Sequence, residues 1–177
     1  MNDFGLSPAY KDEQIVFGSQ KPDQNNVQEW IFFMKEHGIK RVCCLLSQHQ
    51  LRYYNEYYNV DLLETYCKEF GRNNVCLAPV EDFHLADSVT LQKKILPFLA
   101  DANAKKERVV VHCSGGLGRT GHVLAAWLVF NYGFSPGDAI KAVEETGRNP
   151  CEAVYYGYAT MEELYSLLHR CQKDNIV

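Results

Sequence analysis

Residues 108–130 read RVVVHCSGGLGRTGHVLAAWLVF, in which two apolar runs flank a loop rich in glycine. The first run is short and rich in β-branched residues, which predicts a buried strand over 108–112. The second run is too long for a strand and predicts a helix that is apolar on nearly every side. A strand and a helix that both avoid water need further layers to cover them, so the chain is expected to form an α/β domain.

The rest of the chain alternates between short apolar runs and segments with helical spacing, which favours a central, mostly parallel, twisted sheet flanked by helices. We therefore predict a single domain over 1–177, with tails at about 1–11 and 172–177. Pro97 should bend its helix or begin a new turn there. The predicted strands are 14–19, 41–46, 74–80 and 108–112, and the predicted helices are 26–37, 61–71, 88–105, 118–133, 135–147 and 159–171.

The charge and the apolar runs exclude several classes of protein. The net charge of −4 and the pI near 5.9 argue against binding to nucleic acid or to an anionic membrane. The longest fully apolar run, residues 123–130, is far too short to span a bilayer. The first residues lack the pattern of a signal peptide, and the seven cysteines fit no disulfide framework. We expect a cytoplasmic monomer with reduced thiols.

The loop HCSGGLGRTG, residues 112–121, has the chemistry of a phosphate-binding site. Glycines at 115, 116 and 118 allow successive backbone amides to point inward, and the N-terminus of the following helix adds its positive dipole. Arg119 can bind two phosphate oxygens with its guanidinium group. The same positive field favours the thiolate form of Cys113, which makes this residue a nucleophile.

The spacing His112-Cys113-x5-Arg119-Thr120 resembles the signature of the cysteine-dependent protein tyrosine phosphatases. The loop is similar to that of the tyrosine-specific branch, except for Gly115, where alanine is usual, and Leu117, where isoleucine is common. The chain length is similar to that of the compact dual-specificity branch. The resemblance in motif order extends over about 14–170, and it implies hydrolysis of phosphotyrosine, and of phosphoserine or phosphothreonine, through a phosphocysteine.

The resemblance implies a role for each residue of the loop. Cys113 attacks phosphorus, and Thr120 supplies the hydroxyl that stabilises the departing thiolate. His112 orients the loop through hydrogen bonds and does not act as a base. The phosphate-binding residues are Ser114, Gly115, Gly116, Leu117, Gly118 and Arg119.

Transfer of a phosphoryl group to a thiolate needs an acid for the leaving oxygen. In the family this acid is an aspartate about thirty residues before the cysteine, and Asp82 in APVEDFHLAD, residues 78–87, is the match. Glu81 stands where the family often has proline, and the tryptophan of the tyrosine-specific branch is absent, so the sequence departs from the pattern of loop closure. Glu81 and Asp87 are the alternative acids, although Asp87 or Ser88 better fits a helix N-cap.

Three further groups are interpreted structurally. The six histidines form no pair at ligand spacing, so neither a metal nor another cofactor is expected. Arg148 and Asn149 could approach the attacking water, but a solvated helix end is favoured. The aromatic stretch LRYYNEYYNVD, residues 51–61, could line the pocket, but packing of its tyrosines against the sheet is favoured.

Cys43 and Cys44 lie on a predicted strand that should run beside 108–112. Some relatives place a resolving cysteine on the equivalent strand, where it forms a disulfide with the oxidised nucleophile. Alternation along a strand sends the two side chains to opposite faces, so at most one can point toward Cys113. Cys44 is favoured over Cys43, although simple core packing of both is the preferred interpretation.

We therefore predict a phosphatase that acts on phosphorylated proteins. An inositol or phosphoinositide phosphatase is an alternative, which the neutral residues of the loop disfavour. An RNA 5′-triphosphatase is another, which the acidic pI disfavours. A phosphoprotein-binding module without catalysis is a third, but the cysteine, the arginine and the acid are all present. A rhodanese-type sulfurtransferase also uses a loop cysteine, but this alternative is disfavoured because it has no need of Asp82.

Overall fold

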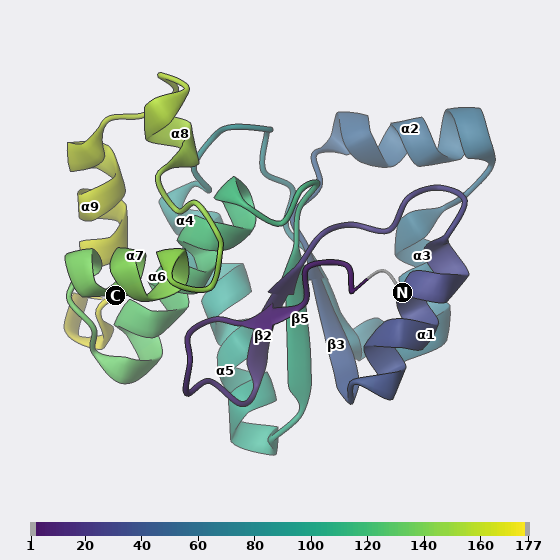
Figure 1. Cartoon of the computed structure of the whole chain (residues 1–177), viewed down its shortest axis with the longest axis horizontal. Helices are drawn as coiled ribbons and strands as arrows, with labels where there is room; N and C mark the ends of the chain where they lie inside the picture. Colours follow the sequence, from purple (N-terminus) through teal and green to yellow (C-terminus); the bar gives the residue numbers. More distant parts are fainter. Residues whose placement is uncertain (1–2, 176–177) are drawn as a thin grey trace.

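The computed structural model describes residues 3–175 and contains one five-stranded sheet in the order β1-β2-β5-β3-β4 (Figure 1). β1 is antiparallel to β2, and the other neighbours are parallel, which confirms the predicted fold class. β5, the strand before the glycine-rich loop, lies at the centre of the sheet. The strands are β1 Ser7–Pro8, β2 Val16–Ser19, β3 Ile39–Cys44, β4 Val75–Leu77 and β5 Arg108–His112.

Helices cover both faces of the sheet (Figure 1). On one face α1 and α3 pack against β3 and β5 in a cluster that includes Trp30, Tyr66 and Val110. On the other face α5, α6, α7 and α9 form a larger cluster that includes Val109 and Val111. The longer helices are α1 Val27–Glu36, α2 Gln48–Tyr58, α3 Leu62–Phe70, α5 Leu96–Lys105, α6 Gly118–Tyr132, α7 Pro136–Glu144 and α9 Met161–His169, and the short ones are η1 Arg72–Asn74, α4 Ser88–Thr90, η2 Leu91–Ile95, α8 Glu152–Tyr155 and η3 Lys173–Asn175.

α6 is the central helix that the apolar run predicts. Every residue from Gly118 to Val129 is buried, because the sheet lies on one side of the helix and α5, α7 and α9 surround the rest. Gly133, at a φ of +71°, ends the helix in the left-handed conformation that glycine adopts readily. The first turn of α6 is therefore anchored in the core, which fixes the position of Arg119.

The helical segment 88–105 changes its winding before Pro97. Asp87 caps α4, where its Oδ1 accepts a hydrogen bond from the Thr90 amide at 2.9 Å. A π-helical turn, η2, follows, and α5 then begins at Leu96 with Pro97 in its first positions. A proline has no N–H to donate to the preceding turn, and it is tolerated where a helical section begins. The expectation that Pro97 begins a new turn is confirmed.

The predicted N-terminal tail is wrong over residues 3–11. Ser7 and Pro8 pair with β2, and Phe4 and Ala9 are buried, so the segment 3–11 belongs to the domain. At the other end the predicted tail begins just after the buried Cys171, and its short helix η3 has no buried residue. Residues 1–2 and 176–177 lie outside the described part. A two-residue edge strand is too short for a pattern of alternation to reveal.

The aromatic stretch 51–61 forms most of α2, which the sequence did not predict. Tyr54 is buried, with its hydroxyl donating to the Pro22 carbonyl, but Tyr53, Tyr57 and Tyr58 are exposed. The expectation that these tyrosines pack against the sheet is therefore wrong for most of them. α8 was also missed, since four residues carry little periodicity.

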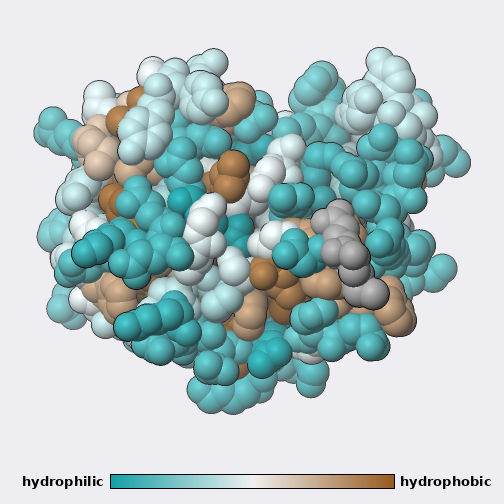
Figure 2. Space-filling model, in the orientation of Figure 1, coloured by the Kyte–Doolittle hydropathy of each residue, from teal (hydrophilic) through white to brown (hydrophobic). Residues whose placement is uncertain are grey.

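The surface seen in Figure 2 is mostly hydrophilic, with apolar residues scattered in small groups. Within residues 3–175, no helix has the length and apolar character needed to cross a bilayer.

Candidate active site

The glycine-rich loop joins the carboxyl end of β5 to the first turn of α6, at the edge where parallel sheets bind ligands. Cys113 follows β5 directly and is 3% exposed. Gly116 has a φ of +72°, and a Cβ there would lie 2.5 Å from the Ser19 carbonyl oxygen. The loop therefore needs glycine at 116, both for its backbone conformation and for its contact with the end of β2.

Arg148 supports this loop from behind. Its guanidinium group donates hydrogen bonds to the carbonyl oxygen of Gly116, to the carbonyl oxygen of Gly5 and to Ser7 Oγ. The side chain is buried, and burial lowers the pKa of Arg148 to about 10. The favoured interpretation of Arg148 as part of a solvated helix end is therefore wrong, because the side chain ties the N-terminal segment to the glycine-rich loop.

His112 is bonded on both ring nitrogens. Nδ1 lies 3.1 Å from the Cys113 carbonyl oxygen, and Nε2 lies 3.0 Å from the Tyr66 hydroxyl. A carbonyl oxygen only accepts, so Nδ1 carries the proton and Tyr66 donates to Nε2. Burial lowers the pKa of His112 to about 4, and the ring is neutral near pH 7. This arrangement is the one expected of a residue that orients the loop.

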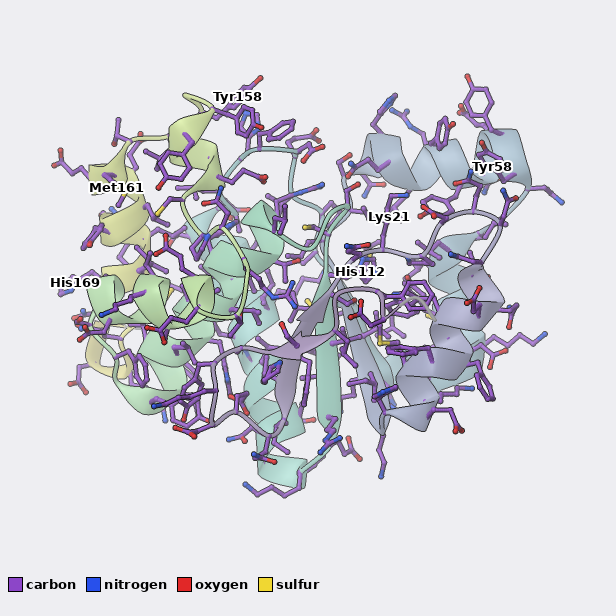
Figure 3. The ribbon with its side chains drawn as sticks, viewed as in Figure 1. Lys21, Tyr58, His112, Tyr158, Met161 and His169 are labelled. Carbon is purple, nitrogen blue, oxygen red and sulfur yellow. The ribbon has the colours of Figure 1, made fainter. Side chains whose placement is uncertain are left out.

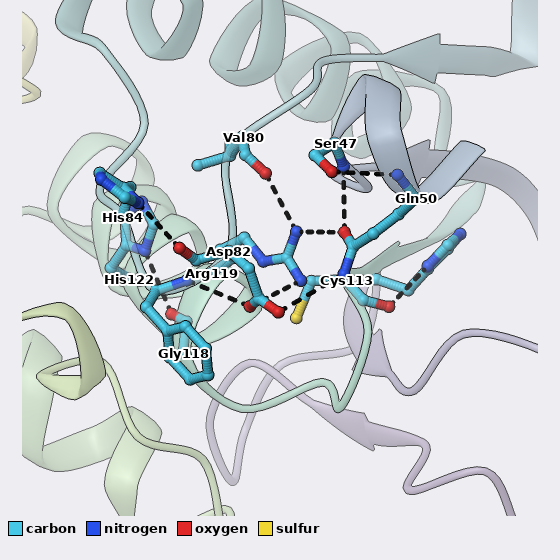
Figure 4. A network of polar contacts seen from close by, with 11 residues as sticks. Ser47, Gln50, Val80, Asp82, His84, Cys113, Gly118, Arg119 and His122 are labelled. Atoms are coloured by element: carbon cyan, nitrogen blue, oxygen red, sulfur yellow. Dashed lines mark hydrogen bonds and ion pairs between the residues drawn. The ribbon is translucent and has the colours of Figure 1, made fainter. Parts of the chain in front are cut away.

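Arg119 is 2% exposed, and its guanidinium group has three acceptors (Figure 4). Nη1 donates to the Val80 carbonyl oxygen at 3.0 Å and to Gln50 Oε1 at 2.8 Å. Nη2 lies 3.0 Å from Asp82 Oδ1. A buried charge requires such partners, and here they come from two segments of the chain, the first turn of α2 and the loop 78–87.

Asp82 is the carboxylate that the structure brings to Arg119, and its side chain remains 44% exposed. The alternative Asp87 is used as the N-cap of α4. The next residue, Phe83, has a φ of +62°, which is strained for a side chain with a Cβ. Its ring packs on Tyr156, with centroids 4.6 Å apart, and on Tyr158 at 6.4 Å. An aromatic cluster therefore holds the loop that carries Asp82.

The edge of the sheet that carries the site lies between two aromatic groups. Figure 3 shows Tyr158 on one side and Tyr58 on the other, with Lys21 and His112 between them. The Lys21 amide donates to the Ser114 carbonyl oxygen at 3.0 Å, so the segment after β2 also touches the glycine-rich loop.

Thr120 Oγ1 is a buried hydroxyl oxygen in the first turn of α6. Among residues 3–175 it has no hydrogen-bond partner. Buried hydroxyl groups are nearly always bonded, so an unpaired one beside a glycine-rich loop is a candidate donor to a reacting atom.

Sequence reasoning missed Gln50, His122 and Glu152. His122 is buried, and its Nε2 accepts a hydrogen bond from the Ala86 backbone amide. Its Nδ1 lies 3.1 Å from the Gly118 carbonyl oxygen, so His122 links the loop 78–87 to α6. The Glu152 side chain lies so close to Gly118 that a Cβ there would be 1.8 Å from Oε2. Burial and the charge of Asp82 raise the pKa of Glu152, while Arg119 lowers it. For Gln50 a signal existed, because Ser47-x-x-Gln50 is the spacing of a capping box.

Cys43 and Cys44 point to opposite faces of the sheet, as alternation predicts. Cys43 belongs to the same core cluster as Cys113, and its thiol is hydrogen-bonded to that of Cys76. Cys44 lies in the other cluster. Burial raises the pKa of Cys44 to about 12, although the hydrogen bond with the Leu46 backbone and the charge of Arg119 lower it. Both cysteines are free thiols, and the disulfide with Cys113 stays a prediction. No cluster of metal-ligating side chains occurs within residues 3–175.

The family model described as the catalytic domain of dual specificity phosphatases matches residues 31–165. Among curated proteins, Tyrosine-protein phosphatase cdcA of Emericella nidulans is 45% identical over 38 residues, which are 22% of this chain and 6% of that protein. Tyrosine-protein phosphatase cdc-14 of Caenorhabditis elegans is 34% identical over 61 residues, which are 34% of this chain and 9% of that protein. The chain therefore matches less than a tenth of either relative.

Solved structures share the fold over nearly the whole chain. Tk-PTP in its active form has a TM-score of 0.66 and 24% identity, with 92% of this chain and 97% of that chain covered. PTPMT1 in complex with PI(5)P has a TM-score of 0.68 and 16% identity, with 94% and 96% covered. At these identities the likeness establishes the fold alone.

Proposed function

The chain belongs to the family of dual-specificity phosphatase catalytic domains, and we propose that it hydrolyses phosphoproteins through a phosphocysteine intermediate. One observation supports this proposal above the others. The buried Arg119 pairs with Asp82 at the loop that Cys113 begins, so cation, acid and nucleophile converge on one edge of the sheet. Phosphoryl transfer to a thiolate needs these three groups.

In the proposed first step, Cys113 Sγ attacks phosphorus as a thiolate and a P–S bond forms. The bond between phosphorus and the leaving oxygen breaks, and that oxygen takes the proton of the Asp82 carboxyl group. Arg119 and the amides of residues 114–118 hold the phosphoryl oxygens while the negative charge moves.

In the second step, Asp82 removes a proton from water, and the water oxygen attacks phosphorus. The P–S bond breaks, inorganic phosphate leaves, and Cys113 returns to the thiolate, toward which Thr120 Oγ1 donates a hydrogen bond. The unpaired, buried state of that hydroxyl supports this role.

The proposal is tested first by Cys113→Ser. We expect this variant to retain the fold and to lose turnover of an aryl phosphate, and vanadate to inhibit the unmodified enzyme. Appreciable activity of Cys113→Ser would remove Cys113 from the role of nucleophile. Chelators are expected to leave the rate unchanged.

The assignment of the acid is tested by Asp82→Asn, with Glu81→Gln as the matched control. Asp82→Asn should slow hydrolysis of phosphotyrosine far more than hydrolysis of an activated ester, whose leaving group hardly needs a proton. Equal slowing of both substrates, or a larger effect of Glu81→Gln, would reassign the acid.

The substrate class is tested on a panel of phosphotyrosyl and phosphoseryl peptides, an inositol phosphate and a 5′-triphosphate RNA. Residues 114–118 carry no charged side chain, which supports phosphopeptides as the substrate. Faster turnover of the inositol phosphate would favour the lipid-directed alternative.

A further inference from the structure

The side chain of Gln50 contacts both Arg119 and Asp82 (Figure 4). Its Oε1 accepts a hydrogen bond from Arg119 Nη1 at 2.8 Å, and its Nε2 donates to Asp82 Oδ2 at 3.5 Å. A primary amide carries an acceptor and a donor on one planar group, so it can serve a cation and a carboxylate together.

The first turn of α2 fixes Gln50 in this place. Ser47 Oγ accepts a hydrogen bond from the backbone N–H of Gln50 at 3.2 Å. In return, the side-chain oxygen Oε1 of Gln50 accepts one from the backbone N–H of Ser47 at 3.1 Å. This reciprocal pair is a capping box, which holds the side chain against the start of its own helix. Gln50 therefore faces Arg119 with little rotational freedom left to lose.

The contacts of Arg119 divide its guanidinium group into two parts. Nη1 is held by the Val80 carbonyl oxygen and by Gln50 Oε1, two neutral acceptors that belong to the protein scaffold. Nη2 lies 3.0 Å from Asp82 Oδ1, an oxygen of a partly exposed side chain. The edge that contains Nη2 is therefore the one that a phosphoryl group can take from Asp82.

We propose that Gln50 is a positioning residue for phosphoryl transfer, an inference that rests on the proposed function. Its oxygen fixes the orientation of the Arg119 guanidinium group. Its nitrogen keeps Asp82 at the site when a phosphoryl group replaces the carboxylate on Nη2. The neutral amide does both without competing for the charge of Arg119.

Replacing the neutral amide of Gln50 by a carboxylate would change the charge that surrounds Asp82. Asp82 faces Arg119 from α6, the carboxyl group of Glu152 from α8, and the uncharged amide of Gln50 from α2. Gln50→Glu would add a second negative charge there, pair with Arg119 and remove the hydrogen bond donated to Asp82. The capping box survives this change, because glutamate is a usual residue at that position of the box.

The experiment compares Gln50→Glu with Ser47→Ala in the full chain. For Gln50→Glu we expect inorganic phosphate to inhibit about tenfold more weakly, since a charged partner now competes for Arg119. The alkaline limb of kcat/KM should move to higher pH by about one unit, because the added charge opposes loss of the Asp82 proton. The Tm should change little.

Ser47→Ala is the control for a purely structural role. It removes the hydroxyl of the cap but keeps the Ser47 backbone amide, which holds Gln50 Oε1. It should therefore lower the Tm by about 3 °C and leave the pH profile and the inhibition by phosphate unchanged. A pH profile and phosphate inhibition of Gln50→Glu equal to those of the unmodified chain would overturn the proposal. If the unmodified chain turned over no substrate, the proposed function would fail, while phosphate binding measured by calorimetry would still test Gln50 on Arg119.

Discussion

Neighbouring glycines of the glycine-rich loop are constrained to different degrees. Gly116 has a positive φ, and a Cβ on it would meet the backbone at the end of β2, 2.5 Å from the Ser19 carbonyl oxygen. Gly115 has no such constraint, because a Cβ there would meet only the Leu117 side chain at 3.9 Å. The loop therefore requires glycine at position 116 but can accommodate alanine at position 115.

We expect Gly116→Ala to lose most phosphatase activity, because the loop must shift away from Ser19 and cannot relax at a positive φ. Gly115→Ala should keep activity within about threefold and match the unmodified protein in stability to within ~0.5 kcal/mol. Steady-state kinetics and urea unfolding of the two variants check this. Equal losses in both would contradict the geometry of the loop.

Glu152 places a negative charge close to Gly118, at the start of α6. Glu152→Gln should therefore strengthen inhibition by inorganic phosphate by about threefold, since one repulsive charge is removed from the site. Glu56→Gln on the exposed face of α2 is the control and should leave inhibition unchanged. Weaker inhibition of Glu152→Gln would indicate that the carboxylate organises the loop.

At the scale of elements, β1 supports the candidate active site although it is remote from it in sequence. Through Gly5 and Ser7, the segment around β1 binds the guanidinium group of Arg148, which also holds the Gly116 carbonyl oxygen. A Cβ on Gly18 in the neighbouring β2 would lie 2.7 Å from the Arg148 side chain, so the sheet makes room for this contact. The edge strand β1 thus supports the loop that follows the central strand β5.

Arg148→Lys should destabilise the protein by about 2 kcal/mol and lower kcat, because one ammonium group cannot reach all three acceptors. Arg72→Lys, in an exposed ion pair with Glu64, is the control and should change stability by less than ~0.5 kcal/mol. Thermal unfolding and steady-state kinetics measure both. If the two variants behaved alike, the hydrogen bonds of Arg148, including the one to Gly116, would contribute nothing to stability.

The elements that sequence could predict carry either a continuous apolar run or a helical period of apolar residues, as in α1. β5 is buried from Val109 to His112 and α6 from Gly118 to Val129, so local apolar patterns were sufficient for these two elements. Asp82 was found through the resemblance to the phosphatase family. β1, α8 and the role of Arg148 depend on contacts between distant segments, which no local pattern contains. For α2, the tyrosines suggested burial, whereas the informative signal was the polar pair Ser47 and Gln50 at its start.

At the scale of the whole molecule, two buried histidines couple stability to pH. Burial lowers the pKa of both His112 and His122 to about 4, from an ordinary value of 6.5. Between these two values the unfolded chain binds more protons than the folded chain, so stability falls as the pH drops below 6.5. Each histidine should cost about 2 kcal/mol between pH 7 and pH 5.

The variant His122→Gln isolates one of these contributions. Its free energy of unfolding should depend less steeply on pH than that of the unmodified chain, by about 2 kcal/mol over the same interval. Urea unfolding at pH 7 and at pH 5 gives the difference directly. Parallel losses in both proteins would mean that His122 takes up its proton equally in the folded and unfolded chains.

The bond between Arg148 and Gly116 also has a consequence for biosynthesis. The two residues are 32 positions apart in the chain, and Arg148 is made after the whole of α6 and α7. At about 5–20 residues per second, a ribosome needs about 2–6 s to add that stretch. During this interval the nascent chain already contains Cys113 and its glycines but lacks the side chain that holds them in place. The glycine-rich loop thus gains its support from Arg148 only after α6 and α7 have been made.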